Sequence, residues 1–379
     1  MLSADSLKSV CGSSQRRIRS RSSSGVIQTA ILPGAAIHRA PGSAEGHVRQ
    51  RDHRYIFPDA ATRDTPDTAS YDHASTSRPW CRTRPSGSPT SAGCRRSRRD
   101  RSRSPSYGIG HNERLLGRAL AGRRGQVTLA TKFGIVRGPD GVQLDGRPDH
   151  VHRYCDASLA RLGVDSIDLY YLHRIDPQVP VAETVGAMAE LVTAVKVRHL
   201  GLSEAGPDDL ERAAGVHPIA AVQFEWSLFW REPEDDVVPT ARRLGIGLVP
   251  YSPLGRGLLA GSVTSDVLQT ASEGDFRRDD PRFSGEHLER NLTLAGELRQ
   301  PADERGRTAA QLALAWLLAQ GTDVVPIPGS RHAGRVAENA AAADLPLCTD
   351  ELARLEVTAG RGAWSGDRHS FAAYGTSRT

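Results

Sequence analysis

Short apolar runs alternate with segments of helical periodicity from residue 107 onward, and links rich in Gly, Asp and Pro separate them. The run Val197–Ser203 is typical, because its hydrophobic residues do not alternate strictly with polar ones. Strands buried on both faces have this composition, and such strands occur in parallel sheets covered by helices. The alternation therefore predicts βαβ units that build a parallel sheet.

The periodicity also bounds the expected elements. We expect six strands, at residues 127–132, 167–173, 197–203, 221–227, 247–252 and 324–328. We expect helices at residues 111–121, 150–162, 183–196, 208–214, 236–244, 286–298, 308–320, 334–342 and 350–357, the last with Thr349 as its N-cap.

Two α/β architectures accommodate this order of elements. A (β/α)8 barrel of the TIM type needs eight strands and about 250 residues, so its first βαβ unit would still have to be found. An open, doubly wound sheet is the alternative. No GxGxxG turn follows a first strand, as a nucleotide-binding doubly wound sheet would require, and this favours the barrel.

The first 106 residues have a different composition, rich in Ser, Arg, Pro and Gly. They carry 19 Lys and Arg against 8 Asp and Glu, whereas residues 107–379 carry 30 against 36. The basic excess of the whole chain therefore belongs to this segment, and it does not indicate that the folded part binds nucleic acid. So little apolar surface cannot offset the entropy of ordering, which predicts a low-complexity, disordered region followed by a barrel domain at 107–379.

The cysteines and the hydropathy exclude several classes of protein. The five cysteines show no CxxC spacing and no histidine at a zinc-like distance, so we expect neither a disulfide framework nor a metal site. Cys155 falls in a helical pattern and is interpreted as a small core residue. No apolar stretch is long enough to span a membrane and no signal-peptide pattern opens the chain, so we expect a cytoplasmic protein.

Polar or reactive residues stand at the carboxyl ends of the predicted strands. They are Lys132, His173, Ser203, Tyr251 and Ser330. Each alone has an ordinary reading, such as a solvated lysine or a histidine satisfied at the rim of the core. Barrel enzymes build their active sites at this end of the strands, so the recurrence favours an active site there.

The sequences around these positions resemble the aldo-keto reductase family from about residue 107 to residue 357. The matching words are Tyr107-Gly, Thr131-Lys-Phe, Leu172-His-Arg, Gly201-Leu-Ser-Glu, Val249-Pro-Tyr-Ser-Pro-Leu-Gly and Val325-Pro-Ile-Pro-Gly-Ser. The resemblance implies a (β/α)8 barrel that reduces an aldehyde or ketone, a small-molecule carbonyl substrate, with a nicotinamide cofactor. Tyr107 would donate the proton, Lys132 would lower the pKa of that tyrosine, and His173 would orient the carbonyl.

The resemblance also implies a set of cofactor-binding residues. Ser203, Glu204 and Gln223 would bind the nicotinamide carboxamide, and Tyr251 would stack on the ring. The family often has asparagine at the position of Glu204. The loop with Ser252, Leu254 and Arg256 would wrap the pyrophosphate.

The adenosine end of the cofactor would lie at the last predicted strand and its helix. Ser330 and Arg335 would hold a 2′-phosphate, because arginine makes bidentate bonds to phosphate and the helix N-terminus adds a favourable dipole. Glu338 and Asn339 would hold the adenine. These residues predict NADPH in preference to NADH.

Residues 1–106 do not share the resemblance. The family carries an aspartate five residues before its tyrosine, in a strand reading roughly Asp-Thr-Ala, and this chain has Ser102 there. Two explanations stay open: translation of this segment in a wrong reading frame, or a genuine Arg/Ser-rich tail on a degenerate barrel. Such a tail could bind nucleic acid through charge, but it lacks interleaved aromatic residues. We therefore expect little reductase activity, and the alternative function is that of an inactive, cofactor-binding regulatory barrel.

Aromatic residues near the mouth offer candidates for substrate contacts. Trp226, Phe229 and Trp230 lie at or just after the end of the strand predicted at 221–227 and could line an apolar pocket or pack at the rim. The C-terminal segment from Trp364 onward could fold over the mouth of the barrel. The sequence does not encode a readable preference for any one carbonyl compound or oligomeric state.

Overall fold

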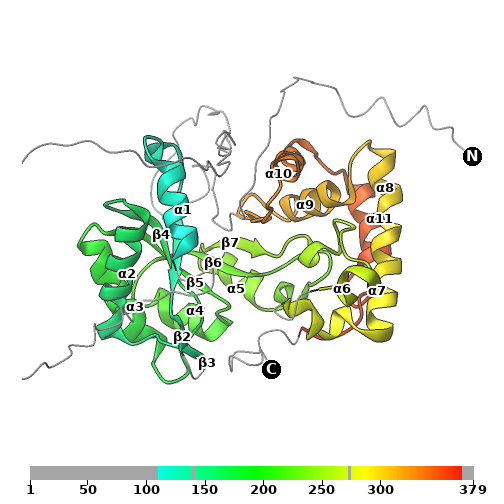
Figure 1. The fold of residues 1–379 in the computed structure, drawn as a ribbon. Helices are drawn as coiled ribbons and strands as arrows, with labels where there is room; N and C mark the ends of the chain where they lie inside the picture. The colour runs from blue at the N-terminus through cyan, green and yellow to red at the C-terminus, as the bar shows by residue number, and fades with distance from the viewer. Residues whose placement is uncertain (1–109, 139–140, 272–274, 369–379) are drawn as a thin grey trace, which may run out of the picture.

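The computed structural model describes residues 110–138, 141–271 and 275–368 (Figure 1). Its main sheet has five parallel strands in the order β1-β4-β5-β6-β7. They are β1 (Ala130–Phe133), β4 (Ile167–Leu172), β5 (Val197–Ser203), β6 (Ile219–Glu225) and β7 (Gly247–Tyr251). A doubly wound sheet reverses its strand order at a switch point, and this order has no reversal, so the described strands follow the winding of a barrel.

A further segment extends the sheet beyond β7. Val324 forms a parallel bridge with Leu248, and the backbone N–H groups of Val325 and Ile327 donate to carbonyls of β7 at 2.8 and 3.0 Å. The strand expected at 324–328 therefore lies at its expected edge, reduced to a single regular bridge. Pro250 of β7 explains the reduction, because it lacks the N–H that would donate to the Val325 carbonyl in a regular parallel ladder.

Helices alternate with these strands along the chain. α1 (His111–Leu120) precedes β1, and α2 (Pro148–Leu162), α3 (Val181–Thr193), α4 (Pro207–Ala214) and α5 (Val237–Arg243) separate the following strands. Each of these helices packs against the next, as the ring of helices around a barrel does. In Figure 1, α1, α2 and α3 lie at the β1 end of the sheet, and α8 to α11 lie at the opposite end.

The strands are buried on both faces, which explains their continuous hydrophobicity. The outer face packs against the helices through a large cluster that includes Tyr170 and Leu172. The inner face carries a separate, smaller cluster formed by Leu169, Tyr171, Ala221 and Val249. A Cβ at Gly201 would meet the Tyr171 ring at 2.5 Å, so this position needs glycine.

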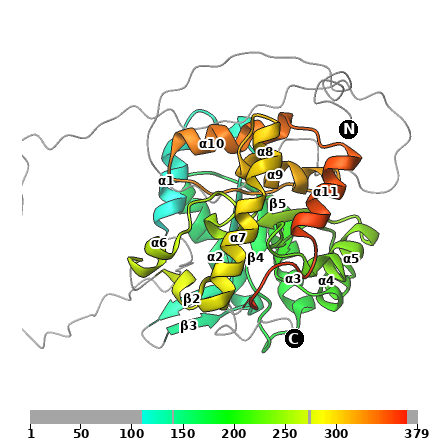
Figure 2. The same cartoon turned by 90° about the vertical axis from the view of Figure 1, so that its right-hand side faces the viewer.

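The C-terminal half adds further helices, and two short ones, at residues 265–269 and 299–304, were not expected from the sequence. The helices are α6 (Ser265–Gln269), α7 (Gly285–Glu297), α8 (Arg299–Glu304), α9 (Ala309–Ala319), α10 (Ala333–Ala340) and α11 (Thr349–Ala359), and Figure 2 views the molecule from their side. Helix α9 begins with a capping box between Thr308 and Gln311. The N-cap of α11 is Cys348, so the prediction of Thr349 as N-cap is wrong by one residue. Cys348 forms a capping box with Glu351.

Besides the short helices α6 and α8, the sequence analysis missed a β-hairpin. An antiparallel hairpin of β2 (Ile135–Gly138) and β3 (Gly141–Leu144) lies between β1 and α2. Cys155 is fully buried, as expected, and burial raises the pKa of its thiol to about 12. Within the described residues, no helix has the length and hydropathy to cross a membrane.

Candidate active site

Lys132, at the end of β1, points across the interior of the sheet. Its Nζ donates a hydrogen bond to Oε1 of Gln223 on β6, and the ammonium lies 5.9 Å from the centre of the Tyr171 ring. Two strands separate β1 from β6 in the sheet, so this bond spans the interior. Burial and the nearby charge of Arg174, opposed by Glu204, together lower the pKa of Lys132 to about 7. The lysine therefore changes charge close to neutral pH.

His173 and Arg174 follow β4 directly. Burial, with the nearby charges of Lys132 and Arg174, holds the pKa of His173 well below its ordinary value. The imidazole is therefore neutral at physiological pH and has one donor and one acceptor nitrogen. Arg174 is buried and donates to the His173 carbonyl at 2.7 Å and to Oγ of Ser203 at 3.3 Å, so it joins the ends of β4 and β5.

Ser203 and Glu204 bring the end of β5 to the same place. Ser203 is fully buried. Glu204 has a left-handed backbone with φ of 56°, which is uncommon for a residue other than glycine. Its N–H donates to the Gln223 carbonyl at 2.8 Å, and its Oε1 accepts from the Glu225 N–H at 3.1 Å. Strained backbone of this kind persists where its surroundings fix it, and here β6 supplies both contacts.

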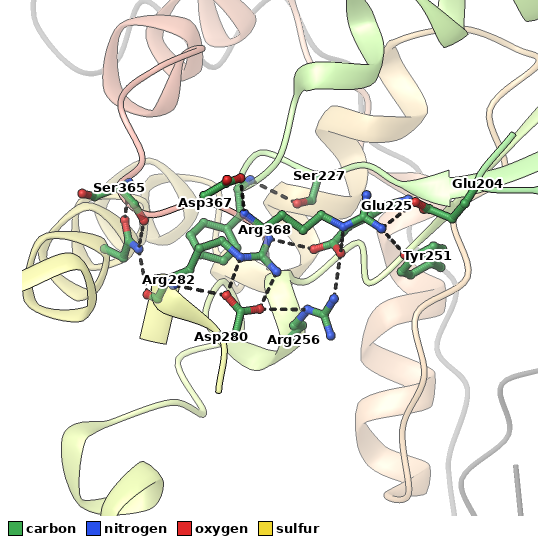
Figure 3. Close-up of polar contacts among 12 residues, drawn as sticks. Glu204, Glu225, Ser227, Tyr251, Arg256, Asp280, Arg282, Ser365, Asp367 and Arg368 are labelled. Atoms are coloured by element: carbon green, nitrogen blue, oxygen red, sulfur yellow. Dashed lines mark hydrogen bonds and ion pairs between the residues drawn. The ribbon is translucent and has the colours of Figure 1, made fainter. Parts of the chain in front are cut away.

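Arg368 enters this region from the C-terminal segment (Figure 3). Its Nη2 donates to Oε2 of Glu204 at 2.6 Å and to the Tyr251 hydroxyl at 2.7 Å, and its Nε lies 3.0 Å from Oε2 of Glu225. The side chain is one tenth exposed. One arginine thus touches the ends of β5, β6 and β7.

Packing and hydrogen bonds fix the segment that carries Arg368. The Trp364 ring packs edge to face on Phe229 at 5.0 Å, and Ser365 exchanges two backbone bonds of 2.8 Å with the Asn291 side chain. The expectation that the C-terminal segment folds over the mouth is confirmed for residues 364–368. The remaining tail residues, 369–379, lie outside the described part.

Arg368 belongs to a buried group of charges that we call the mouth cluster. Its members are Glu204, Glu225, Arg256, Asp280, Arg282 and Arg368 (Figure 3). Glu225 is fully buried and binds Arg256 at 2.8 Å and Arg282 at 2.9 Å, and Arg282 also binds Asp280 at 2.7 Å. Buried charges are tolerated when they are paired and hydrogen-bonded, as these are. Burial would raise the pKa of Glu225, but the three arginines hold it far below its ordinary value.

The residues predicted to bind the nicotinamide and the pyrophosphate lie in different surroundings in the structure. Gln223 lies beside Lys132, and Tyr251 lies beside Arg368 and through it Glu204. Ser252 accepts a backbone bond from Gly255, and Leu254 is half-buried in the same loop. Arg256, expected at the pyrophosphate, turns its side chain to Glu225, which makes it part of the mouth cluster.

The residues expected at the adenosine end form a separate group on and before α10, which we call the α10 end. Ser330 is half-buried and accepts a bond from the His332 N–H at 3.1 Å, and Arg335 is exposed. Glu338 accepts a bond from the Thr308 hydroxyl at 2.6 Å, which ties α10 to α9. Asn339 is buried on the other side of the helix end.

The proton donor expected from the sequence, Tyr107, lies outside the described residues, as does Ser102. Of the three predicted catalytic residues, the structure therefore brings together Lys132 and His173. The aromatic candidates also separate: Trp226 and Phe229 are buried in the core, and Trp230 is half-buried against Arg282 and Arg368.

The fold and the site define an α/β-barrel protein whose polar residues converge at the carboxyl ends of parallel strands. Residues 103–358 match the sequence model described as the Aldo/keto reductase family, and the chain belongs to that family. Members of this family are (β/α)8 barrels, so the fold class predicted from the sequence is confirmed.

Comparisons with individual relatives agree with the family assignment. The chain is 43% identical over 265 residues to "Probable aldo-keto reductase 1" of Glycine max, a match that covers 69% of this chain and 76% of the relative. It is similar in structure to the glycerol dehydrogenase AKR11B4 of Gluconobacter oxydans, with a TM-score of 0.62, 29% identity and coverage of 73% and 81%. An aldo/keto reductase of Klebsiella pneumoniae in complex with NADP and acetate matches with a TM-score of 0.52, 27% identity and coverage of 69% and 80%. Family membership makes the chain an oxidoreductase of small carbonyl compounds.

Proposed function

We propose that the chain reduces an aldehyde or ketone to an alcohol with NADPH, and that Tyr107 donates the proton. The observation that carries the proposal is the pairing of Lys132 with Gln223 across the sheet interior, beside a neutral His173. The ammonium of a lysine stabilises a nearby phenolate and so makes a tyrosine a stronger acid. A neutral imidazole can donate an N–H to a carbonyl oxygen without competing for the proton.

The residues at the strand ends suit a nicotinamide. A carboxamide needs both donors and acceptors, and Ser203 and Gln223 are buried polar side chains that offer both. Tyr251 presents an aromatic ring at the end of β7, which suits stacking on a flat heterocycle. The cofactor would supply the hydride when bound, while the side chains of this chain bind, orient and move the proton.

The α10 end supports the choice of NADPH over NADH. Arg335 and Arg331 are exposed cations on and just before α10, and the helix N-terminus attracts anions. A 2′-phosphate distinguishes NADPH from NADH, and guanidinium groups bind phosphate in bidentate fashion. The reducing cytoplasm is our proposed location, and the described cysteines, Cys155 and Cys348, are both free thiols.

The test is a spectrophotometric assay of NADPH consumption with a panel of small aldehydes and ketones, together with the variant Tyr107→Phe. We expect the variant to keep its affinity for NADPH, because the ring remains. Its turnover should fall about 10²–10⁴-fold, the usual value of general acid catalysis. Unchanged turnover in Tyr107→Phe would assign the proton donor elsewhere.

A second candidate function, cofactor binding without turnover, is favoured by Ser102 in the position of the family's aspartate. The same assay separates the two candidates, since a regulatory barrel would bind NADPH and consume none with any substrate of the panel. If the chain is a reductase that lacks only its first strands, replacing residues 1–106 with a strand-helix-strand unit that ends in Asp-Thr-Ala should create activity. A replaced chain that binds NADPH and stays inactive would favour the regulatory function.

A further inference from the structure

Glu204 places a buried carboxylate among the residues proposed to hold the nicotinamide. It follows Ser203 directly, and its side chain is 5% exposed. Oε1 accepts from the Glu225 N–H and Oε2 binds Arg368, so both oxygens are used. Burial would raise the pKa of Glu204, but Arg368 and Arg174 outweigh it and hold the pKa below its ordinary value. The group is therefore an anion at neutral pH.

Arg368 matches that anion with a cation. Its guanidinium bridges Glu204, Glu225 and the Tyr251 hydroxyl, and it lies 5.9 Å from the centre of the Tyr251 ring. Without Arg368, Glu225 would keep Arg256 and Arg282 at 2.8 and 2.9 Å. Among the described residues Glu204 would keep no other salt bridge; it would keep the hydrogen bond of Tyr251 and the longer-range interactions with Arg174 and Lys132. Removal of Arg368 would therefore uncover mainly the charge of Glu204.

The two oxidation states of a nicotinamide differ in charge. The ring of NADP⁺ is a cation, and the ring of NADPH is neutral. An uncompensated carboxylate beside the ring stabilises the oxidised form, and an uncompensated guanidinium stabilises the reduced form. A balanced pair of the two favours neither.

We propose that Glu204 and Arg368 together set the relative affinity of this site for the oxidised and reduced cofactor. This inference rests on the proposed binding of a nicotinamide at the strand ends. Arg368 cancels the charge of Glu204, so that NADP⁺ is not held more tightly than NADPH and leaves after reduction of the substrate. The C-terminal segment thus contributes a positioning residue that tunes the direction of the reaction through charge.

A purely structural role for Arg368 predicts a different result. If the arginine only fastens the C-terminal segment, its loss lowers the thermal stability and weakens both oxidation states alike. If its charge acts on the site, its loss changes the ratio of the two dissociation constants. The ratio therefore separates the two roles, and it can be measured without any turnover.

The experiment is calorimetric titration of NADP⁺ and of NADPH into the full chain and its variants, at one ionic strength and pH. Arg368→Met should lower the ratio of the NADP⁺ to the NADPH dissociation constant by at least about tenfold, and Glu204→Gln should raise it by a similar factor, given unit charges in a partly buried site. The double variant should return the ratio to within about threefold of the wild type, because the pair is removed together. Arg361→Ala is the matched control, since Arg361 lies on the same segment and pairs with exposed Asp235, and it should leave the ratio unchanged.

Ratios unchanged in both single variants would overturn the inference. Binding of neither oxidation state by the wild-type chain would overturn the proposed function and this inference with it. If Arg368→Met does not fold, Glu204→Gln decides alone, because the amide keeps an oxygen for the Glu225 N–H and removes only the charge.

Discussion

The two ends of the proposed cofactor site differ in how their charged residues are solvated and paired. At the mouth cluster, charges are buried and paired with one another, and residues from β5, β6, β7 and the C-terminal segment hold them in place. At the α10 end, Arg335 is exposed to solvent and Ser330 is half-buried. The first arrangement fixes geometry at the reacting end, where fractions of an ångström matter. The second offers solvated charges that need only attract a phosphate.

The largest difference between the two ends should appear in stability. Glu225→Gln leaves Arg256, Arg282 and Arg368 without the carboxylate they share, and breaking a buried ion pair costs about 3–5 kcal/mol of unfolding free energy. Glu211→Gln is the matched control, because Glu211 pairs with Arg243 where both are more than half exposed. In urea denaturation, the control should lose less than about 1 kcal/mol of unfolding free energy. Equal losses in the two variants would show that the mouth cluster contributes no more than a surface pair.

A substitution at the α10 end should change the affinity for the cofactor and leave the stability of the fold unchanged. Arg335→Ala should weaken NADPH binding about tenfold to a hundredfold, the usual value of a hydrogen bond to a charged group, and leave NADH binding nearly unchanged. Its thermal midpoint without ligand should not move, since the side chain is exposed. Arg354→Ala removes another exposed arginine, one paired with Glu304 on α8, and serves as control. Equal losses of affinity for both cofactors would remove Arg335 from the phosphate site.

A third expected effect is a pH dependence of stability at Lys132, which lies at the mouth but outside the mouth cluster. The folded chain releases this proton near pH 7, whereas the unfolded chain retains it to about the ordinary pKa of 10.5. The unfolded state then binds more protons between these values, so stability should rise with pH across that window. Lys132→Met should remove this rise.

Lys196→Met provides the control for this slope. Asp156 raises the pKa of Lys196, so its proton stays bound in both states over most of the same window. The unfolding free energy of wild type and control should therefore change in parallel. A wild-type chain whose stability is flat or falls from about pH 7 to about pH 10, relative to Lys132→Met, would contradict the lowered pKa.

The sheet could be predicted from the sequence because its signal is local. The strand 197–203 is found at the expected residues, and β4 and β7 differ from expectation by one residue at one end. The β2–β3 hairpin was missed although a signal exists, since Asp140-Gly141 lies between two short runs rich in Val and Ile, a typical hairpin pattern. The short length of these runs, four residues each, made them resemble a loop.

The mouth cluster could not be predicted because its partners are distant in sequence. Glu225 offers the one local signal: it is the only charged residue in the strand Ala221-Val-Gln-Phe-Glu, and a buried charge requires a partner. Nothing in the sequence says that the partners are Arg256, Arg282 and Arg368. Lys132, His173, Ser203 and Tyr251 could be proposed because each lies at the end of its own strand, and barrel geometry gathers strand ends. Gln223 was proposed from the family resemblance alone.

The dependence of the mouth on Arg368 has a consequence for protein synthesis. Domains fold from their N-terminal side as the ribosome extends the chain. Arg368 follows every described strand and helix in the sequence, so it is translated after all of them. Until then, the nascent barrel contains Glu204 without its salt-bridge partner. A polypeptide terminated early, or clipped by a protease before residue 368, would retain every described strand and still lack the residue that joins the ends of three of them.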